Sequence, residues 1–224
     1  MGKKLVTFSY DDGVLQDKRL VDIFNTYGVK GTFNLNYSLL GSDFTFMAKE
    51  VEVKRIKLEE VKNLYEGHEV AGHSLTHPGL CDLGEEELTN EIKVDKEKLE
   101  ELLGYQLVGF AYPFGSTNET VITELKKSGY QYARNVEDTF GFDLPQNLYE
   151  WEPTCHHNHS EIFELIETFL ANDNNQDKLF YIWGHSYEFD ADDNWEQIEK
   201  ICRAFSKSEE VIFLTNSEVL KYLM

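Results

Sequence analysis

Short apolar segments alternate with amphipathic segments along almost the whole chain, and this alternation constrains the fold more than any other feature. Runs of strand length are followed by stretches whose apolar residues recur at helical spacing. The predicted strands span residues 5–10, 30–35, 69–72, 108–112, 130–134, 179–183 and 211–214, and the predicted helices span 20–27, 58–65, 84–103, 121–127, 162–170, 195–205 and a short C-terminal segment. Strands that each precede a helix are typical of parallel βαβ units. The pattern predicts an α/β protein, either a closed barrel or an open doubly wound sheet.

Residues 37–57 interrupt this alternation, and only Val51, Glu52 and Val53 within them alternate like part of a surface strand. We expect this stretch to be an excursion over one end of the domain. The 224-residue chain has four prolines, no Ser/Gly/Pro-rich linker and no internal repeat. It is therefore predicted to form one domain over residues 1–224.

The charge balance excludes two classes of partner. The chain carries 41 acidic and 21 basic residues, which gives a formal charge of −20. Nucleic acid and anionic membrane surfaces would repel such a chain, so neither is an expected partner. The three cysteines are widely spaced, and the sequence contains neither a signal peptide nor an apolar run of about 18 residues. A cytoplasmic protein is expected, although a chain trimmed of its leader would look the same, and the oligomeric state stays open.

Two adjacent carboxylates, Asp11 and Asp12, follow the first predicted strand and precede Gly13, where the chain can turn away. Neighbouring acids repel each other unless something compensates, and a metal ion is the usual compensation. Taken alone, the stretch also fits an ordinary turn with two solvated aspartates.

A pair of histidines four residues apart, His73 and His77, follows another predicted strand. On a helical turn this spacing places both rings on one face, close enough to bind one metal ion. Two histidines and one carboxylate form a known ligand set for Zn²⁺, Co²⁺ or Fe²⁺. Asp12 can supply the carboxylate, which leaves Asp11 to act as a base on a water molecule.

Polar residues that can carry chemistry recur just after the predicted strands, namely Asp11, His73, Tyr112 and His185. A (β/α) barrel gathers its active site at the carboxyl ends of its strands, whereas an open sheet does so only near a switch point. Contributions from four strands to one place therefore favour a barrel.

Four stretches of the chain resemble motifs of the polysaccharide deacetylase family (NodB homology, carbohydrate esterase family 4). Residues 7–13 (TFSYDDG) resemble the family's TFDDG, with Ser9 and Tyr10 intervening, and residues 73–77 (HSLTH) resemble H-[ST]-x-x-H. Residues 110–115 (FAYPFG) resemble R-P-P-Y-G, and residues 183–185 (WGH) resemble a fifth motif, an apolar strand that ends in a histidine. The matches occur in the family's order over almost the whole chain. The resemblance implies a distorted (β/α) barrel of about seven strands and a metal-dependent N-deacetylase.

Carried over residue by residue, the resemblance implies that Asp12, His73 and His77 are the metal ligands and that Asp11 is the catalytic base. It also implies that His185 is the general acid that protonates the departing amine, and that the backbone N–H of Phe114 helps to hold the oxyanion.

One motif residue is missing. The family has an arginine that orients the catalytic aspartate, and the corresponding position in this sequence is Ala111. Arg134, at the end of the following predicted strand, is predicted to supply the guanidinium instead, the alternative being an ordinary surface residue.

The fourth motif is less distinct. Residues 150–152 (EWE) stand where the family often has Asp-Trp, so they are expected to supply a carboxylate for His185 and, through Trp151, an aromatic wall for a sugar ring. Tyr112, Trp183 and Tyr187 are further candidates for stacking on a sugar, although aromatic residues at strand ends are more often part of the core.

Three histidines cluster in residues 154–159 (TCHHNH). They suggest a second metal site, but adjacent histidines point in different directions on any regular element. A loop with one histidine, of His156, His157 and His159, near the pocket is the preferred interpretation. Cys155 is expected to be a packed thiol.

The predicted function is a metal-dependent hydrolase that removes N-acetyl or related acyl groups from amino sugars, oligosaccharides or polysaccharides. Its cofactor would be a divalent metal, foremost Zn, with Co, Fe or Ni as alternatives, and its partner an N-acetylated carbohydrate. Two other functions stay open, namely an amide or cyclic ureide hydrolase on the same fold, and a carbohydrate-binding protein that has lost activity.

Overall fold

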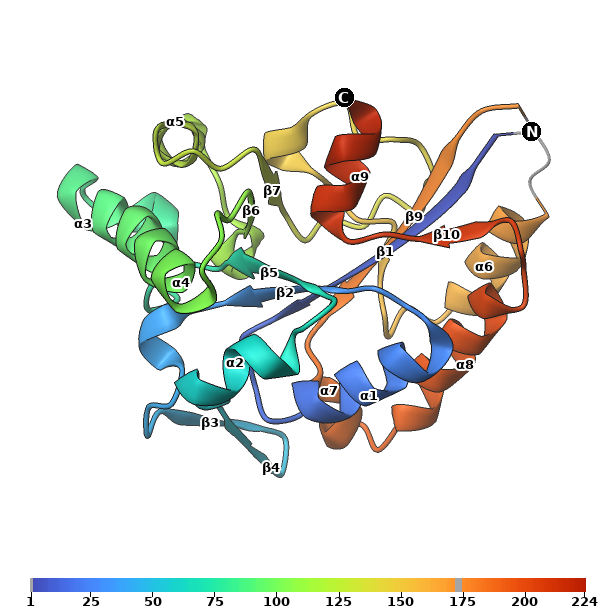
Figure 1. Cartoon of the computed structure of the whole chain (residues 1–224), viewed down its shortest axis with the longest axis horizontal. Helices are drawn as coiled ribbons and strands as arrows, with labels where there is room; N and C mark the ends of the chain where they lie inside the picture. Colours follow the sequence, from blue (N-terminus) through green and yellow to red (C-terminus); the bar gives the residue numbers. More distant parts are fainter. Residues whose placement is uncertain (1, 172–174) are drawn as a thin grey trace.

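The computed structural model describes residues 2–171 and 175–224. Its main sheet is entirely parallel, with seven strands in the order β7-β6-β5-β2-β1-β9-β8 and β10 beside β1 (Figure 1). The strands are β1 (Lys4–Asp11), β2 (Thr32–Leu35), β5 (Glu69–Gly72), β6 (Gly109–Ala111), β7 (Tyr132–Arg134), β8 (Cys155–His156), β9 (Lys178–Gly184) and β10 (Val211–Phe213).

The seven strands curl into a half-barrel whose two edge strands, β7 and β8, are joined through the segment that precedes β8. The amide of Trp151 donates to the carbonyl of Ala133 on β7 at 3.0 Å, and that of Thr154 donates to Tyr181 on β9 at 2.8 Å. The predicted distorted barrel of about seven strands is confirmed. The two-residue strand β8 escaped prediction because so short a run has no periodicity to detect.

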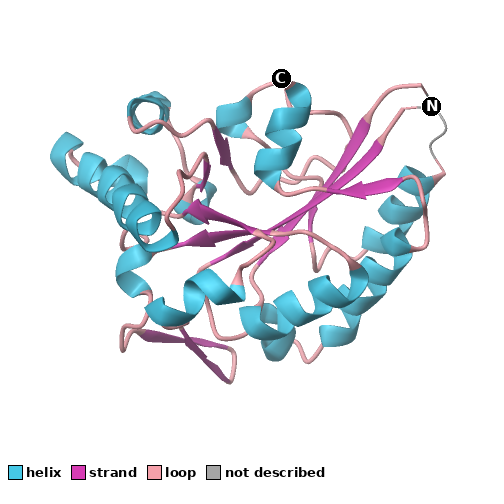
Figure 2. Cartoon of the chain, viewed as in Figure 1, coloured by secondary structure: helices cyan, strands magenta, loops and turns pink. Residues whose placement is uncertain are grey.

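The helices cover both sides of the curled sheet: the C-terminal helix packs on the inner face, in the cluster of Leu5, Trp151 and Tyr181, and the others lie outside (Figure 2). They are α1 (Asp17–Tyr27), α2 (Leu58–Leu64), α3 (Glu85–Thr89), α4 (Asp95–Leu103), α5 (Glu119–Lys127), α6 (Ile162–Leu170), α7 (Tyr187–Ala191), α8 (Trp195–Ser206) and α9 (Asn216–Leu223). The long predicted helix 84–103 is two helices joined by a π-helical turn, Asn90–Val94. Gly28 ends α1 in the left-handed conformation (φ 66°).

The excursion at residues 37–57 contains an antiparallel hairpin of β3 (Thr45–Ala48) and β4 (Val51–Lys54). In Figure 1 the hairpin stands apart from the main sheet, at the lower edge of the molecule. No helix in the described ranges is both long and apolar enough to cross a membrane.

Strand β1 is buried along its whole length, as expected for a central parallel strand. Phe8 and Tyr10 point toward α1, where both rings contact Phe24. The alternate residues face the other side, where Leu5 packs in a second apolar cluster and Thr7 hydrogen-bonds Asn216 at the start of α9. Because side chains alternate, Asp11 ends the strand on this second, more polar face.

Candidate active site

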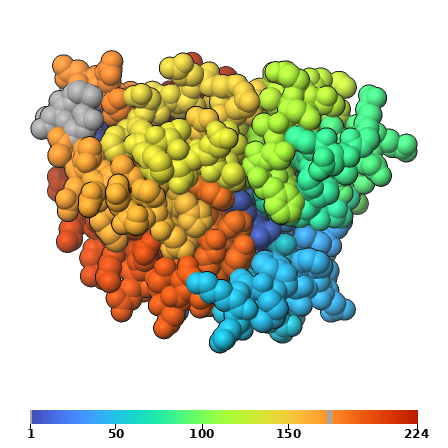
Figure 3. Space-filling model, turned by 180° about the vertical axis from the view of Figure 1, so that it is seen from behind, coloured from blue at the N-terminus to red at the C-terminus, as the bar shows by residue number. Residues whose placement is uncertain are grey.

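A cavity of about 640 Å³ opens where several parallel strands end. Figure 3 shows a hollow in which the N-terminal part of the chain, in deep blue, lies between segments coloured light blue, green and orange. The acidic, basic and imidazole side chains that line the cavity are those of Asp11, Asp12, Arg55, His73, His77 and His185. They come from the ends of β1, β5 and β9 and from the segment after β4. The parallel topology therefore gathers at one edge the residues that the sequence placed after separate strands.

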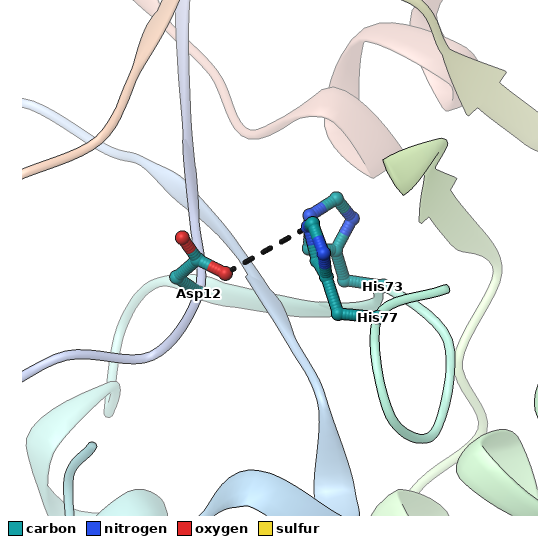
Figure 4. A group of neighbouring side chains, drawn as sticks. All are labelled: Asp12, His73 and His77. Carbon is teal, nitrogen blue, oxygen red and sulfur yellow. Dashed lines mark ion pairs between the residues drawn. The ribbon is translucent and has the colours of Figure 1, made fainter. Parts of the chain in front are cut away.

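Asp12, His73 and His77 can hold one metal ion, since each offers a ligand atom within 4.8 Å of the others (Figure 4). Nδ1 of His73 lies 2.7 Å from the carbonyl oxygen of Ala111, which fixes the ring, and Nε2 is buried without a hydrogen-bond partner among the described residues. Burial lowers the pKa of His73 to about 4, so its ring is neutral at neutral pH. A fixed neutral imidazole with a bare inner nitrogen is what a metal ligand requires.

The two histidines are not on a helix, which corrects the helical turn expected for this motif. Residues 73–77 form a loop in which Ser74 (φ 65°) and His77 (φ 64°) have left-handed backbone conformations. The rings of His73 and His77 still meet, with centroids 4.8 Å apart. Glu91 in the π-helical turn holds the loop, because its carboxylate accepts from the amide and hydroxyl of Thr76 at 2.8 and 2.7 Å.

Asp11 and Asp12 have different partners because the chain turns between them. Asp12 (φ 86°) and Gly13 (φ 61°) leave the strand with successive positive φ angles. Oδ1 of Asp12 lies 3.9 Å from Nε2 of His77 and 2.8 Å from Nη1 of Arg55. Burial opposes ionisation of Asp12, but the charge of Arg55 and the histidines outweigh it and lower the pKa.

Asp11 is held by a guanidinium that comes from the far edge of the sheet. Nη2 of Arg134 lies 2.7 and 2.5 Å from its two carboxylate oxygens, and the side-chain amide of Asn34 donates to Oδ1 at 2.7 Å. Burial alone would raise the pKa of Asp11, but Arg134, His73 and His185 lower it to about 2. Asp11 is therefore a carboxylate at any physiological pH.

The predicted replacement of the missing arginine is confirmed as a contact. Arg134 is fully buried on β7, where it is in register with Ala111 on β6, the position that the arginine has in the family motif. Its guanidinium stacks on Trp183, 4.9 Å from the ring centroid, and Nη1 donates to the carbonyl of Asn135. The guanidinium that contacts Asp11 therefore comes from β7, whereas the family motif places it on the adjacent strand, β6.

His185 follows β9, and its Nε2 lies 4.0 Å from Oδ2 of Asp11. Burial lowers the pKa of His185, but Glu188 and the charges of Asp12 and Asp11 raise it to about 9. The carboxylate partner is thus Glu188, three residues downstream on α7, and not residues 150–152. The H-x-x-E spacing on a helical turn was the sequence signal for Glu188.

Trp151 does not line the cavity, which corrects its predicted role as an aromatic wall. It is 2% exposed and packs edge-on against Tyr132 and Tyr181. Its backbone joins β7 to the segment before β8, so its large ring fills the interior of the half-barrel.

Aromatic residues do line the cavity: Phe44, Phe46, Tyr112, Phe114, Trp183 and Tyr187. Phe114 is 70% exposed, has a positive φ of 60°, and lies with its ring centroid 4.7 Å from that of His77. The Tyr112 hydroxyl instead donates to the carbonyl of Tyr149, so Tyr112 is locked in place. Phe44, Phe46 and Arg55 belong to the excursion, and no local pattern in the sequence pointed to them.

The histidines of residues 154–159 lie outside this cavity. His156 and His157 contact the far side of Glu188, and His159 packs on Phe140. Cys155 is buried, and burial raises the pKa of its thiol, as expected for a packed residue.

The fold and the site define an α/β half-barrel protein with a two-histidine, one-carboxylate group beside a second, arginine-bound carboxylate. Residues 1–133, more than half of the chain, match the family model for polysaccharide deacetylase. The chain belongs to the polysaccharide deacetylase family.

Two curated relatives are a chitin deacetylase from Pestalotiopsis sp, 26% identical over 138 residues, and the peptidoglycan-N-acetylglucosamine deacetylase PgdA from Listeria monocytogenes, 28% identical over 137 residues. Each alignment covers 60% of this chain, but only 42% of the first relative and 27% of the second. The chain therefore matches less than half the length of either.

Solved structures share the fold at low identity. The Xyl-CE4 domain of a multidomain xylanase from the hindgut metagenome of Trinervitermes trinervoides matches with a TM-score of 0.67 at 18% identity, over 100% of this chain and 92% of that one. The Streptococcus pyogenes deacetylase PplD matches with a TM-score of 0.56 at 21% identity, over 64% of this chain and 61% of that one.

Proposed function

We propose that this protein is a divalent-metal-dependent N-deacetylase that acts on N-acetylated amino sugars within oligosaccharides or polysaccharides. One observation carries the proposal, namely that the Asp12–His73–His77 group and the Arg134-bound carboxylate of Asp11 open into one cavity. A binding protein has no need of a second carboxylate that is kept ionised. The curated relatives that act on chitin and peptidoglycan support the substrate class.

The donor set fits a metal ion, because Nε2 of His73 is buried and lacks a hydrogen-bond partner among the described residues. Oδ1 of Asp12 is also buried, and its contact is an ion pair with Arg55. Two imidazole nitrogens and one carboxylate suit Zn²⁺ best, with Co²⁺, Fe²⁺ or Ni²⁺ as alternatives. A divalent ion held there would supply Lewis acidity, which polarises an acyl carbonyl and lowers the pKa of water.

The remaining residues divide the proton transfers between them. Asp11 is ionised and fixed by Arg134, so it accepts a proton from the attacking water. His185 keeps its proton to about pH 9, and its Nε2 lies 4.0 Å from Asp11 at the cavity, so it donates to the departing amine. The backbone N–H of Phe114, at the mouth of the cavity, is assigned to the oxyanion.

The alternative of an inactive carbohydrate-binding protein was based on the missing arginine. It has less support, because Arg134 contacts Asp11 in place of that arginine. The amide or cyclic ureide alternative differs from the proposal in its product, so the same experiment decides between them.

The test is acetate release by the purified, zinc-loaded protein from N-acetylchitooligosaccharides and from peptidoglycan fragments, with cyclic ureides and O-acetylated xylan as comparison substrates. We expect acetate from the N-acetylated sugars, and loss of that activity after chelation. Turnover of ureides without acetate would instead establish the alternative hydrolase, and sugar binding without any turnover would establish the binding protein.

A further inference from the structure

The carboxylate of Glu188 is surrounded by three imidazoles. Its Oε2 lies 3.0 Å from Nε2 of His156 and 3.3 Å from Nε2 of His157, and its Oε1 lies 3.5 Å from Nδ1 of His185. The backbone N–H of His185 also donates to Oε2 at 3.1 Å. Only His185 opens into the catalytic cavity, so the other two imidazoles form a layer behind it.

His156, His157 and Glu188 have the composition of a metal site, but the hydrogen bonding of His156 opposes one. The amide of Asn158 donates to Nδ1 of His156 at 3.1 Å, so Nδ1 carries a lone pair. In a neutral ring the hydrogen is then on Nε2, the atom that faces Glu188. A metal ion would need the lone pair that Nε2 lacks in this tautomer, whereas a carboxylate oxygen accepts its hydrogen.

The contacts of Glu188 set the orientation of His185. With Oε2 directed at His156 and at the amide of His185, Oε1 is the oxygen that faces Nδ1 of His185. When the ring of His185 is neutral, its hydrogen is thereby favoured on Nδ1, and in either protonation state Nε2 is directed toward Asp11. At 3.5 Å this contact is an ion pair, and Nδ1 of His185 is buried without a hydrogen-bond partner among the described residues.

The ring of His157 is held in place by packing. It is fully buried and stacked between Tyr10 and Phe189, with ring centroids at 5.6 and 4.2 Å. A Cβ at Gly184, the residue before His185, would come within 2.0 Å of Nδ1 of His157. A glycine is needed there so that the backbone leading to His185 can pass the ring.

We propose that Glu188 and His156 are positioning residues that act through His185, with His156 fixing the Glu188 carboxylate and Glu188 fixing the imidazole of His185. The proposal rests on the proposed function, in which His185 donates the proton to the departing amine. The charged groups that face His185 are Glu188 on the helix that follows it, α7, and Asp11 and Asp12 at the end of β1.

The test compares two substitutions of His156 that differ in which ring nitrogen they imitate. His156→Asn keeps an acceptor near the Asn158 amide but has no group at the position of Nε2, whereas His156→Gln extends an amide donor toward Glu188. We expect kcat to fall about 10-fold in His156→Asn, with KM, metal content and melting temperature little changed, and to recover to within about 2-fold in His156→Gln. His159→Asn, in the same loop but outside the layer, serves as the control.

Glu188→Gln is the second variant. We expect kcat to fall by roughly 100-fold, since a general acid contributes about 10²–10⁴, and the alkaline limb of the pH profile to move at least one unit lower. The double variant with His156→Asn should be no worse than Glu188→Gln alone, because both act through one contact.

Three results would overturn the proposal. They are wild-type activity in His156→Asn, equal loss in the Asn and Gln variants, and a second equivalent of zinc that His156→Asn fails to bind. Nitrogen-15 NMR of His185 above about pH 9, where its ring is neutral, tests the same arrangement without substrate. We expect Nδ1–H in the wild type and a mixture of tautomers in Glu188→Gln. A wild-type protein that releases no acetate but shows Nδ1–H would refute the proposed function and leave the positioning intact.

Discussion

A single nitrogen of Arg134 contacts both carboxylate oxygens of Asp11, at 2.7 and 2.5 Å, although the two residues are 123 positions apart. Both side chains are almost completely buried. Removing one member of such a pair leaves an uncompensated charge, which costs more than the pair itself contributes.

Arg134→Met should therefore reduce both stability and catalysis. We expect a loss of about 3–5 kcal/mol in the free energy of unfolding, a fall in kcat of roughly 100-fold, and a raised pKa for Asp11. Metal content should not change, because Arg134 contacts none of the candidate ligands. Denaturant unfolding, elemental analysis and the acidic limb of the pH profile measure these effects, and unchanged turnover would exclude the assigned role.

A second arginine position provides the matched control. Ala111→Arg in the Arg134→Met background returns the guanidinium to the adjacent strand, in the register that the family motif implies. We expect partial recovery of kcat. If the double variant is folded but remains as slow as Arg134→Met, then β7 is the only strand from which the guanidinium can reach Asp11 productively.

Substitutions of the two neighbouring aspartates should have different effects on metal binding and on kcat. Asp11→Asn is expected to bind one metal ion per chain and to lose more than about 10³-fold in kcat, because only the base is removed. Asp12→Asn is expected to lose metal affinity by at least about 10-fold, because Oδ1 faces His77. Calorimetric titration with zinc and acetate assays distinguish them, and loss of metal in Asp11→Asn would reverse the two roles.

Arg55 and a metal ion compete for Oδ1 of Asp12, since Nη1 of Arg55 lies 2.8 Å from that oxygen. In Arg55→Met the metal-free protein keeps a buried carboxylate without a compensating charge. We expect the metal-free form to melt at a lower temperature, and zinc to raise the melting temperature by more than it does in the wild type. In Arg55→Lys, which retains the charge, the rise in melting temperature caused by zinc should lie between those of the wild type and Arg55→Met. An equal rise in all three proteins would argue against competition.

Asp17 is a further buried carboxylate, and it makes the stability of the fold depend on pH. Its carboxylate is fully buried and accepts from the hydroxyls of Ser186 at 2.5 Å and Tyr65 at 2.6 Å, yet burial raises its pKa to about 7. The pKa of Asp17 in the folded state lies above its unfolded value. Its contribution to the free energy of unfolding is therefore fully present below about pH 4 and is lost as the pH rises through 7.

The matched variant is Asp17→Asn, which has the shape of the protonated acid and does not titrate. We expect the stability of the wild type relative to Asp17→Asn to fall between about pH 4 and about pH 7, as measured by thermal unfolding at each pH. A difference that is constant over this range would show that Asp17 is not protonated in the folded protein.

The sequence by itself determined which residues stand at strand ends. The alternation of strands and helices predicted the parallel α/β fold, and the motifs around Asp11, His73 and His185 predicted which strands would contribute. These are local properties, because hydrophobic periodicity and turn residues act over a few positions along the chain. Even the replacement of Ala111 by Arg134 was predictable, since both residues end adjacent strands.

Only the tertiary structure decided which side chains meet. The tertiary structure places Trp151 in the interior and brings Arg55, which follows the hairpin, to Asp12, and neither outcome has a local signal. Likewise, His73 and His77 converge through a loop with positive φ angles and not through helical spacing. The physical reason is that strand register and sheet curvature depend on packing over the whole domain, and both place side chains from distant segments at one site.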